Sequence, residues 1–158
     1  MNIMLKKIEE IYELSPFCTP NMSCLAITNT CNLKCKYCYQ NQDAQEILNA
    51  EVWLTFLDHF RNSSSDDKLV TITGGEPLIS KDSRNTVARI SKKAKEEEMT
   101  VTMVSNGMHF KDFFLEHSMD NIDCFDISVD GPENINDSIR GKGSYKKAME
   151  GLKVLQAN

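Results

Sequence analysis

Residues 31–38 read Cys31-Asn32-Leu33-Lys34-Cys35-Lys36-Tyr37-Cys38. This spacing brings three thiolates together on one short loop and supplies three corners of a tetrahedral or cubane metal site. Structural zinc sites normally close all four positions, whereas catalytic metal sites keep one position open. Cysteine-rich loops also suit iron–sulfur clusters, whose irons take thiolate ligands. Because no fourth ligand is obvious, the loop predicts a 4Fe–4S cluster with one iron free to bind something else.

With Tyr37 in the aromatic slot, this loop resembles the signature of the radical S-adenosylmethionine (radical SAM) superfamily. The resemblance implies that Cys31, Cys35 and Cys38 hold the cluster and that its open iron binds the methionyl amino and carboxylate groups of SAM. It also implies reductive cleavage of SAM to a 5′-deoxyadenosyl radical that abstracts a substrate hydrogen. A peptide or protein substrate and an electron donor of the flavodoxin or ferredoxin type are implied as partners.

The composition of the chain fits a globular protein and excludes some functions. The 158 residues are 41% hydrophobic and 26% charged, and the net charge of −5 offers no basic footprint for nucleic acid. No apolar run approaches the ~20 residues that a membrane helix needs, and the N-terminus lacks a secretory signal. Six cysteines in such a chain indicate metal binding more often than disulfides, so a cytoplasmic location is predicted.

Strand and helix patterns alternate along the chain. We expect strands at 22–28, 68–73, 99–105 and 122–129, and helices at 3–13, 81–98 and 111–117. Two more helices are expected, one that Asn49 caps at its start and one that begins at Ser144. The chain is thus divided into an N-terminal helix and lead-in (1–21) and a core domain (22–158). The pattern predicts an α/β fold with a parallel sheet and right-handed crossovers, a (β/α) partial TIM barrel. In such folds the site lies at the carboxyl ends of the strands.

Thr73-Gly74-Gly75-Glu76-Pro77 follows the second expected strand. Two glycines allow close backbone approach and unusual φ angles, and a plain strand-to-helix turn would also explain them. The segment resembles the Gly-Gly-Glu motif of the same family. The resemblance implies that Gly74, Gly75 and Glu76 contact the methionyl ammonium group of the cofactor.

The fourth expected strand places polar residues on one face. Alternation puts Phe125, Ile127 and Val129 on one side and Asp126, Ser128 and Asp130 on the other. A solvated edge would explain this pattern, but a barrel interior with Ser128 and Asp130 lining the cofactor pocket is favoured.

The segment after the fourth strand resembles the corresponding segment of the SPASM-type, peptide-modifying branch of the family. There a serine and an arginine twelve residues later contact the ribose or carboxylate of the cofactor, and Ser128 and Arg140 match that spacing. An exposed loop cation is the alternative for Arg140. Ser105-Asn106-Gly107 resembles the Thr/Ser-Asn-Gly of the third strand, which implies a cofactor contact by Asn106, although a simple turn would also explain it.

The remaining cysteines carry less information. Cys24 and Cys124 lie in expected strands and are expected to be buried structural thiols. Cys18 or Cys24 could instead complete a non-catalytic zinc site, which is the main alternative function. Isolated His59, His109 and His117 have no ligand spacing and are expected to be structural or on the surface.

The resemblance extends over Met22 to Leu155, but the radical SAM core has six β/α units and only about four are expected here. The fifth and sixth strands and a cysteine-rich C-terminal region are missing. The simplest interpretation is a truncated chain of a longer enzyme. The 158-residue chain alone is therefore expected to cleave SAM slowly and without coupling to a substrate, or to be an inactive fragment.

Overall fold

A computed structural model describes residues 20–40, 49–62 and 67–157. The expected helix at 3–13, most of the expected lead-in and Cys18 lie outside the described residues. Within those residues no helix is both long enough and apolar enough to cross a membrane.

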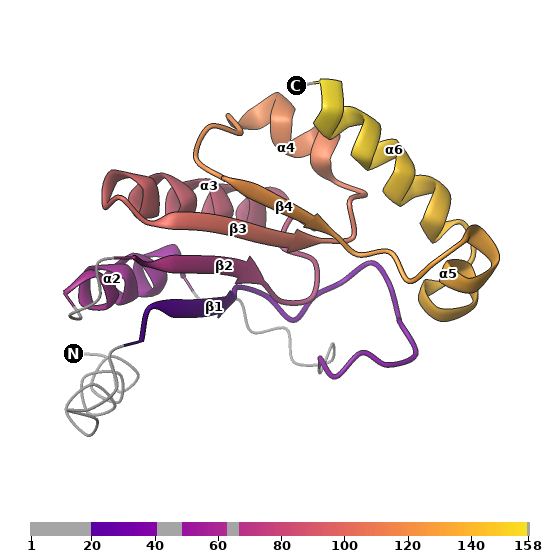
Figure 1. Ribbon diagram of the computed structural model, residues 1–158, viewed down its shortest axis with the longest axis horizontal. Helices are drawn as coiled ribbons and strands as arrows, with labels where there is room; N and C mark the ends of the chain where they lie inside the picture. The colour runs from indigo at the N-terminus through magenta and orange to yellow at the C-terminus, as the bar shows by residue number, and fades with distance from the viewer. Residues whose placement is uncertain (1–19, 41–48, 63–66, 158) are drawn as a thin grey trace.

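Four parallel strands form one sheet in the order β1-β2-β3-β4 (Figure 1). They are β1 (Met22–Ala26), β2 (Leu69–Thr73), β3 (Thr100–Ser105) and β4 (Cys124–Ile127). Neighbours in the sequence are neighbours in the sheet, and a helix lies in the chain between each strand and the next. The predicted α/β fold, a parallel partial barrel with four β/α units, is confirmed.

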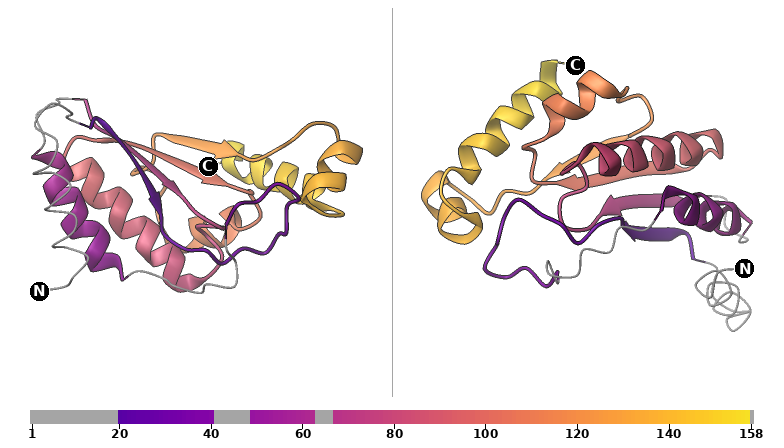
Figure 2. Two further views of the ribbon diagram at one scale, coloured as in Figure 1. Left: turned by 90° about the horizontal axis from the view of Figure 1, so that it is seen from below. Right: turned by 180° about the vertical axis from the view of Figure 1, so that it is seen from behind.

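The described residues form five helices beside the sheet: α2 (Ala50–Arg61), α3 (Lys81–Glu96), α4 (Phe110–Glu116), α5 (Glu133–Arg140) and α6 (Ser144–Ala157). The predicted cap of α2 is confirmed, because the Asn49 side chain accepts a hydrogen bond from the Glu51 N–H. Helix α5 was not expected from the sequence. Helices α2, α3 and α4 lie on one side of the sheet, as the two views of Figure 2 show.

The core lies between the sheet and these helices. Alternate strand residues such as Leu25, Ile72 and Met103 are buried against Phe60 of α2 and Ile90 of α3. This face takes the apolar half of every strand, which is why strands with only alternate apolar residues fold stably here.

The opposite face of the sheet is more exposed and polar. Cys24, Thr71, Thr102 and Cys124 form one row of register partners across the four strands. The two threonine hydroxyls are 2.9 Å apart, and both cysteines are exposed. The prediction that Cys24 and Cys124 are buried is therefore wrong: both belong to the face that the described helices do not cover.

Strand β4 is shorter than expected. It ends at Ile127, and the Ser128 N–H donates to the Ser105 carbonyl at 2.9 Å. Phe125 and Ile127 pack against the core as predicted, but Val129 lies beyond the strand and is 36% exposed. Ser128 and Asp130 therefore belong to the connection after the strand, at its carboxyl end.

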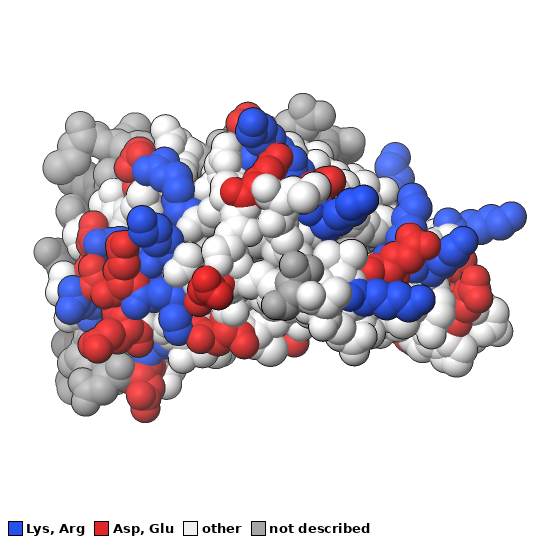
Figure 3. Space-filling model, turned by 90° about the horizontal axis from the view of Figure 1, so that it is seen from above, with Lys and Arg blue, Asp and Glu red and all other residues white. Residues whose placement is uncertain are grey.

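Charged side chains of both signs are interspersed over the face shown in Figure 3. No continuous basic stripe crosses this face, in keeping with the net charge of −5.

Candidate metal and cofactor site

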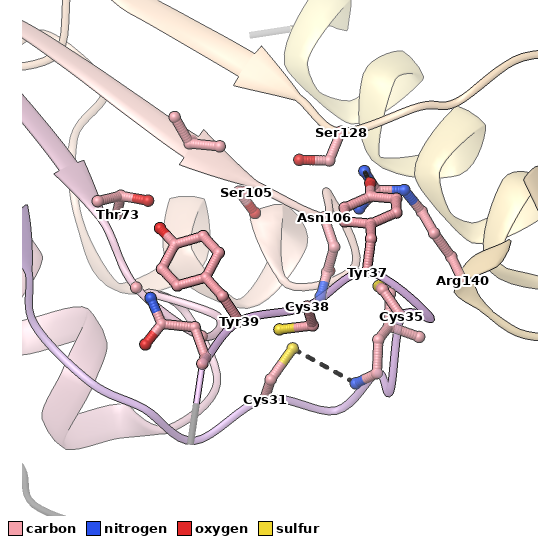
Figure 4. Close-up of a pocket in the computed structure, with 15 residues that line it drawn as sticks. Cys31, Cys35, Tyr37, Cys38, Tyr39, Thr73, Ser105, Asn106, Ser128 and Arg140 are labelled. Carbon is pink, nitrogen blue, oxygen red and sulfur yellow. Dashed lines mark hydrogen bonds between the residues drawn. The ribbon is translucent and has the colours of Figure 1, made fainter. Parts of the chain in front are cut away.

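A cavity of about 230 Å³ lies where the segments that follow the four strands meet. Nine of the eleven residues predicted for the site line it: Cys31, Cys35, Tyr37, Cys38, Gly74, Gly75, Asn106, Ser128 and Arg140. Figure 4 shows the cysteine loop below the cavity, with Ser105 and Ser128 above it and Arg140 to one side. Glu76 and Asp130 are not among its lining residues.

The three thiols share this cavity but differ in exposure. Cys31 and Cys35 are half-buried, whereas Cys38 is exposed. The Leu33 N–H donates to Cys31 Sγ at 3.4 Å, and the Cys38 N–H donates to the Cys35 carbonyl at 3.0 Å. Burial raises the pKa of the Cys31 and Cys35 thiols. A bound metal must therefore displace protons from both groups, which makes metal binding favourable at higher pH.

The donor set is three thiolates around one cavity, the ligand type that an iron–sulfur cubane takes. Among the described residues, the three thiols are not gathered around a single ion position. Zinc draws its thiolates to about 2.3 Å from a common centre, whereas each thiolate of a cubane binds a different iron. Cys24 lies on β1 and does not line the cavity, so it does not supply a fourth ligand.

The Gly-Gly turn after β2 packs directly against the start of the cysteine loop. The Gly75 N–H donates to the Thr28 carbonyl at 2.7 Å, and the Glu76 N–H donates to the Thr30 carbonyl at 2.9 Å. A Cβ atom on Gly75 would lie 2.3 Å from the Thr30 carbonyl oxygen. Glycine is therefore required here for close backbone approach.

Glu76 is fully buried behind this turn. Its Oε1 accepts hydrogen bonds from the Leu78 N–H at 3.1 Å and the Ser105 hydroxyl at 2.9 Å. Its Oε2 accepts one from the Asn106 N–H at 2.8 Å. Burial raises the pKa of the Glu76 carboxyl, and the three hydrogen bonds oppose this shift. The carboxylate thus ties the connection after β2 to the end of β3.

Asn106 continues this tie to the cysteine loop. Its Nδ2 donates to Asn32 Oδ1 at 2.7 Å, and its Oδ1 accepts from the Met108 N–H at 3.0 Å. Asn106 is 6% exposed, so these bonds are largely shielded from water. The sequence indicated Asn106 but gave no sign that Asn32 is its partner.

The other end of the cysteine loop is held by residues after β4. Arg140 donates from Nε to Asp130 Oδ2 at 2.6 Å and from Nη2 to Asp130 Oδ1 at 3.2 Å. Tyr37 donates its hydroxyl to Asp130 at 2.9 Å, accepts from Arg140, and has the guanidinium 5.6 Å from its ring centroid. The Lys36 N–H also donates to the Ile139 carbonyl at 3.1 Å.

These contacts show how exposed the Arg140 side chain is and which residues Asp130 binds. The Arg140 side chain is only 13% exposed and lies at the end of α5, so the alternative of an exposed loop cation is wrong. The hydrogen bond from Arg140 holds the pKa of Asp130 below its ordinary value, and partial desolvation of the hydroxyl together with its hydrogen bond to Asp130 raises the pKa of Tyr37. Asp130 acts in this structure as the partner of Arg140 and Tyr37 and does not itself line the cavity.

Two further residues support the site through hydrogen bonds, and the sequence did not predict this role for them. Asn136 is fully buried, accepts from the Asp130 N–H at 3.1 Å and donates to the Ser144 hydroxyl at 2.8 Å. Asp137 accepts from the Tyr145 N–H at 2.9 Å at the start of α6. Their signal was the Asn136-Asp137 pair itself, which lies in the segment that resembles the SPASM branch.

Comparison with known proteins agrees with this geometry. A family model described as the radical SAM superfamily matches residues 25–158. Among curated relatives, the sporulation killing factor maturation protein SkfB of Bacillus subtilis is 32% identical, over 85% of this chain and 32% of its own. The serine-type anaerobic sulfatase-maturating enzyme of Bacteroides thetaiotaomicron is 29% identical, over 80% of this chain and 34% of its own. A GTP 3′,8-cyclase of Peptoclostridium acidaminophilum is 30% identical, over 84% of this chain and 42% of its own.

Solved structures share the fold at lower identity. The anSMEcpe structure with bound AdoMet and Cp18Cys peptide has a TM-score of 0.64 and 16% identity, and covers 86% of this chain and 39% of that chain. Streptococcus suis SuiB bound to precursor peptide SuiA has a TM-score of 0.65 and 18% identity, and covers 94% of this chain and 34% of that chain. The chain spans about a third of the length of the first curated relatives it matches.

Proposed function

The chain belongs to the radical SAM superfamily, and on that premise we propose that it binds a 4Fe–4S cluster on Cys31, Cys35 and Cys38 and cleaves SAM reductively. The observation that carries this proposal is the shared cavity. All three thiols line it together with residues from the carboxyl ends of β2, β3 and β4. Three thiolates leave one iron without a protein ligand, as cofactor binding requires.

The residues around the cavity suit the parts of SAM that they face. When bound and reduced, the cluster supplies the electron that cleaves SAM to methionine and a 5′-deoxyadenosyl radical. Gly74 and Gly75 present backbone at the cavity, where the methionyl end is proposed to lie. Glu76 does not line the cavity and is fully buried on three protein donors, so it is proposed to act on the ammonium group indirectly, by holding the turn that presents this backbone.

The ribose and carboxylate are proposed to lie near β4. Ser128 and Arg140 both line the cavity there, and Tyr37 borders it from the cysteine loop. Arg140 is already oriented by Asp130, so its remaining guanidinium N–H groups are held in a fixed direction. Because Nε and Nη2 already bind Asp130, Nη1 is the group proposed to donate to the carboxylate, and a donor held in place binds without first losing side-chain entropy.

A peptide or protein is the proposed substrate, modified by an enzyme of the SPASM-type branch. The supporting observations are the similarity to a killing factor maturation protein and to a sulfatase-maturating enzyme, and the shared fold with SuiB, solved with a precursor peptide. An electron donor of the flavodoxin or ferredoxin type and a cytoplasmic setting, where thiols remain reduced, complete the proposal.

A nucleotide substrate is the second candidate, because a GTP 3′,8-cyclase is 30% identical over 139 residues. The two candidates are separated by the dependence of 5′-deoxyadenosine formation on added GTP. An unchanged rate in the presence of GTP supports the peptide proposal, whereas a GTP-dependent rise supports the nucleotide.

The proposal is tested by the iron and sulfide content of anaerobically reconstituted variants. Replacing Cys31, Cys35 or Cys38 with Ala is expected to abolish cluster assembly, because each removes one of three thiolates. Cys24→Ala and Cys124→Ala are matched controls, since both thiols lie on the exposed face of the sheet. A full cluster in Cys35→Ala would overturn the ligand assignment, and a zinc-loaded wild type would support the non-catalytic metal module instead.

A further inference from the structure

We infer that Asn106 is a positioning residue that fixes the Cys31 end of the cysteine loop through Asn32. The inference rests on the proposed function in one respect, because it concerns the loop that would hold the cluster. It assigns Asn106 a role besides the cofactor contact that the sequence implied. It also assigns a role to Asn32, which stands between Cys31 and Cys35 without being a metal ligand.

The contact joins two segments that are far apart in the sequence. Asn106 Nδ2 lies 2.7 Å from Asn32 Oδ1, a short distance for an amide hydrogen bond. Asn32 directly follows Cys31, so a restraint on its side chain limits how far the Cys31 backbone can move. Figure 4 shows Asn106 directed from the end of β3 toward the cysteine loop.

The orientation of both amides is defined by their other partners. Asn106 Oδ1 accepts from the Met108 N–H at 3.0 Å, so the opposite end of the amide, Nδ2, must be the donor toward Asn32. Asn32 then accepts with Oδ1 and places its own Nδ2 3.1 Å from Met108 Sδ. Met108 therefore contacts both asparagines, and the three residues form a closed set of contacts.

Asn106 can act as an anchor because it is itself held firmly. Its backbone N–H donates to Glu76 Oε2 at 2.8 Å, and that carboxylate is fully buried. The next residue, Gly107, donates its N–H to the Ser105 hydroxyl at 3.0 Å. A side chain with a fixed backbone loses little entropy on forming its own hydrogen bond, so the bond to Asn32 is preorganised.

The cysteine loop is thus restrained near both ends. Near Cys31 the restraint is the Asn32–Asn106 bond, and near Cys38 it is the contact of Tyr37 with Asp130 and Arg140. The geometry of three thiolates must match the cluster within a fraction of an ångström, and a rigid loop meets that requirement without distortion of the cluster.

The experiment is a double-mutant cycle on the reconstituted protein, with the variants Asn32→Ala, Asn106→Ala and the pair together. The rate of iron release to a ferrous chelator is measured under anaerobic conditions, together with the electron paramagnetic resonance (EPR) spectrum of the reduced cluster. Each single variant is expected to release iron about three to ten times faster than wild type, as the loss of one hydrogen bond predicts. The double variant should be no faster than either single one, because both remove the same bond.

Two further variants separate positioning from a general loss of stability. Asn32→Asp keeps an oxygen acceptor for Asn106 Nδ2 and is expected to remain near the wild-type rate. Asn85→Ala, on the exposed side of α3, is the matched control and should change neither the rate nor the spectrum. Multiplicative effects of the two single variants, or single variants that release iron at the wild-type rate, would overturn the inference.

A second measurement tests the inference without the cluster. In the cluster-free protein, the rate at which iodoacetamide alkylates half-buried Cys31 should rise in both single variants, whereas that of exposed Cys24 should not change. Unchanged Cys31 alkylation would contradict the inference. If wild-type protein assembles no iron–sulfur cluster but Cys31 alkylation rises as expected, the proposed function fails and the positioning role stands.

Discussion

Arg140 binds both carboxylate oxygens of Asp130, with Nε 2.6 Å from Oδ2 and Nη2 3.2 Å from Oδ1. Tyr37 of the cysteine loop contacts both residues: its hydroxyl donates to Asp130 and accepts from Arg140. The pair therefore joins the end of α5 to the connection after β4 and to the cysteine loop at one point. The planar fork of arginine makes this two-point contact, which the single ammonium group of lysine cannot reproduce.

Arg140→Lys is expected to lower the free energy of unfolding by about 1–2 kcal/mol, because charge-assisted hydrogen bonds between side chains that are 13% and 21% exposed are lost. The matched control is Arg89→Lys, whose partner Glu51 forms an ion pair with 48% and 65% exposed side chains. Such a surface pair contributes little, so the control should change stability by less than about 0.5 kcal/mol. Urea unfolding measures both, and equal effects would contradict the special role of the Arg140–Asp130 pair.

The contribution of Asp130 to the free energy of unfolding is expected to decrease at low pH. Its pKa is lowered in the folded protein by Arg140, relative to an ordinary value of 3.8. The stabilisation is therefore fully present above that ordinary value and is lost as the pH falls through the lower folded value. Asp130→Asn should be less stable than wild type from pH 5 to 7, and this difference should begin to shrink near pH 3.8 and close only below the lower pKa of the folded protein. A difference that persists unchanged into strong acid would show that the charge of Asp130 is not what stabilises the contact.

Glu76→Gln is expected to destabilise the protein by about 1–3 kcal/mol. The carboxylate accepts from the Leu78 N–H, the Ser105 hydroxyl and the Asn106 N–H, and an amide must turn its NH2 group toward at least one of these donors. A buried donor left without an acceptor costs this much. Exposed Glu96→Gln, which removes only a surface pair with Lys92, is the control and should be nearly neutral.

The outcome for Glu76 also reports its charge state. Burial raises its pKa and three hydrogen bonds oppose the shift, so losing the charge stabilises the protein only where the cost of burial exceeds the contribution of those bonds. A stabilising Glu76→Gln variant would show that the protein folds with a protonated Glu76, and would contradict the three-donor account of this side chain.

Gly75→Ala is expected to prevent the close contact between the turn after β2 and the start of the cysteine loop. The new Cβ would lie 2.3 Å from the Thr30 carbonyl oxygen, which is backbone and cannot rotate away. We expect a loss of more than about 2 kcal/mol of stability together with reduced iron content after reconstitution. Gly143→Ala is the control: its φ of +80° is strained for alanine, but no atom lies within 4 Å of the new methyl group. Gly75 is not among the glycines with positive φ, so a loss in Gly75→Ala no larger than that in Gly143→Ala would contradict the cost assigned to the close approach.

The sequence predicted the sheet, the cysteine loop and most of the cavity, because these depend on local patterns. Alternating apolar residues mark strands, and Gly74-Gly75 marks a turn whatever the rest of the chain does. Helix α5 was missed because its sequence, Glu133 to Arg140, is largely polar, begins after Pro132 without a side-chain cap, and buries only Asn136. A short helix held by polar contacts has no apolar stripe to reveal it.

Side-chain partners across the chain could not be predicted. The Asn32–Asn106 bond joins residues 74 positions apart, and the Tyr37–Asp130 bond joins residues 93 positions apart. A single sequence carries no signal for such pairs. The exposure of Cys24 and Cys124 was missed for a related reason, since alternation predicts that two faces exist but not which face the helices cover.

The central claim is that three cysteines hold a cluster whose open iron takes SAM. The most direct test is EPR spectroscopy of the anaerobically reconstituted, dithionite-reduced protein during titration with SAM, alongside iron and sulfide analysis. We predict about four irons and four sulfides per chain and a cluster signal that changes saturably as SAM is added. A protein that binds one zinc ion and no iron, or a cluster signal that SAM leaves unchanged, would contradict the claim.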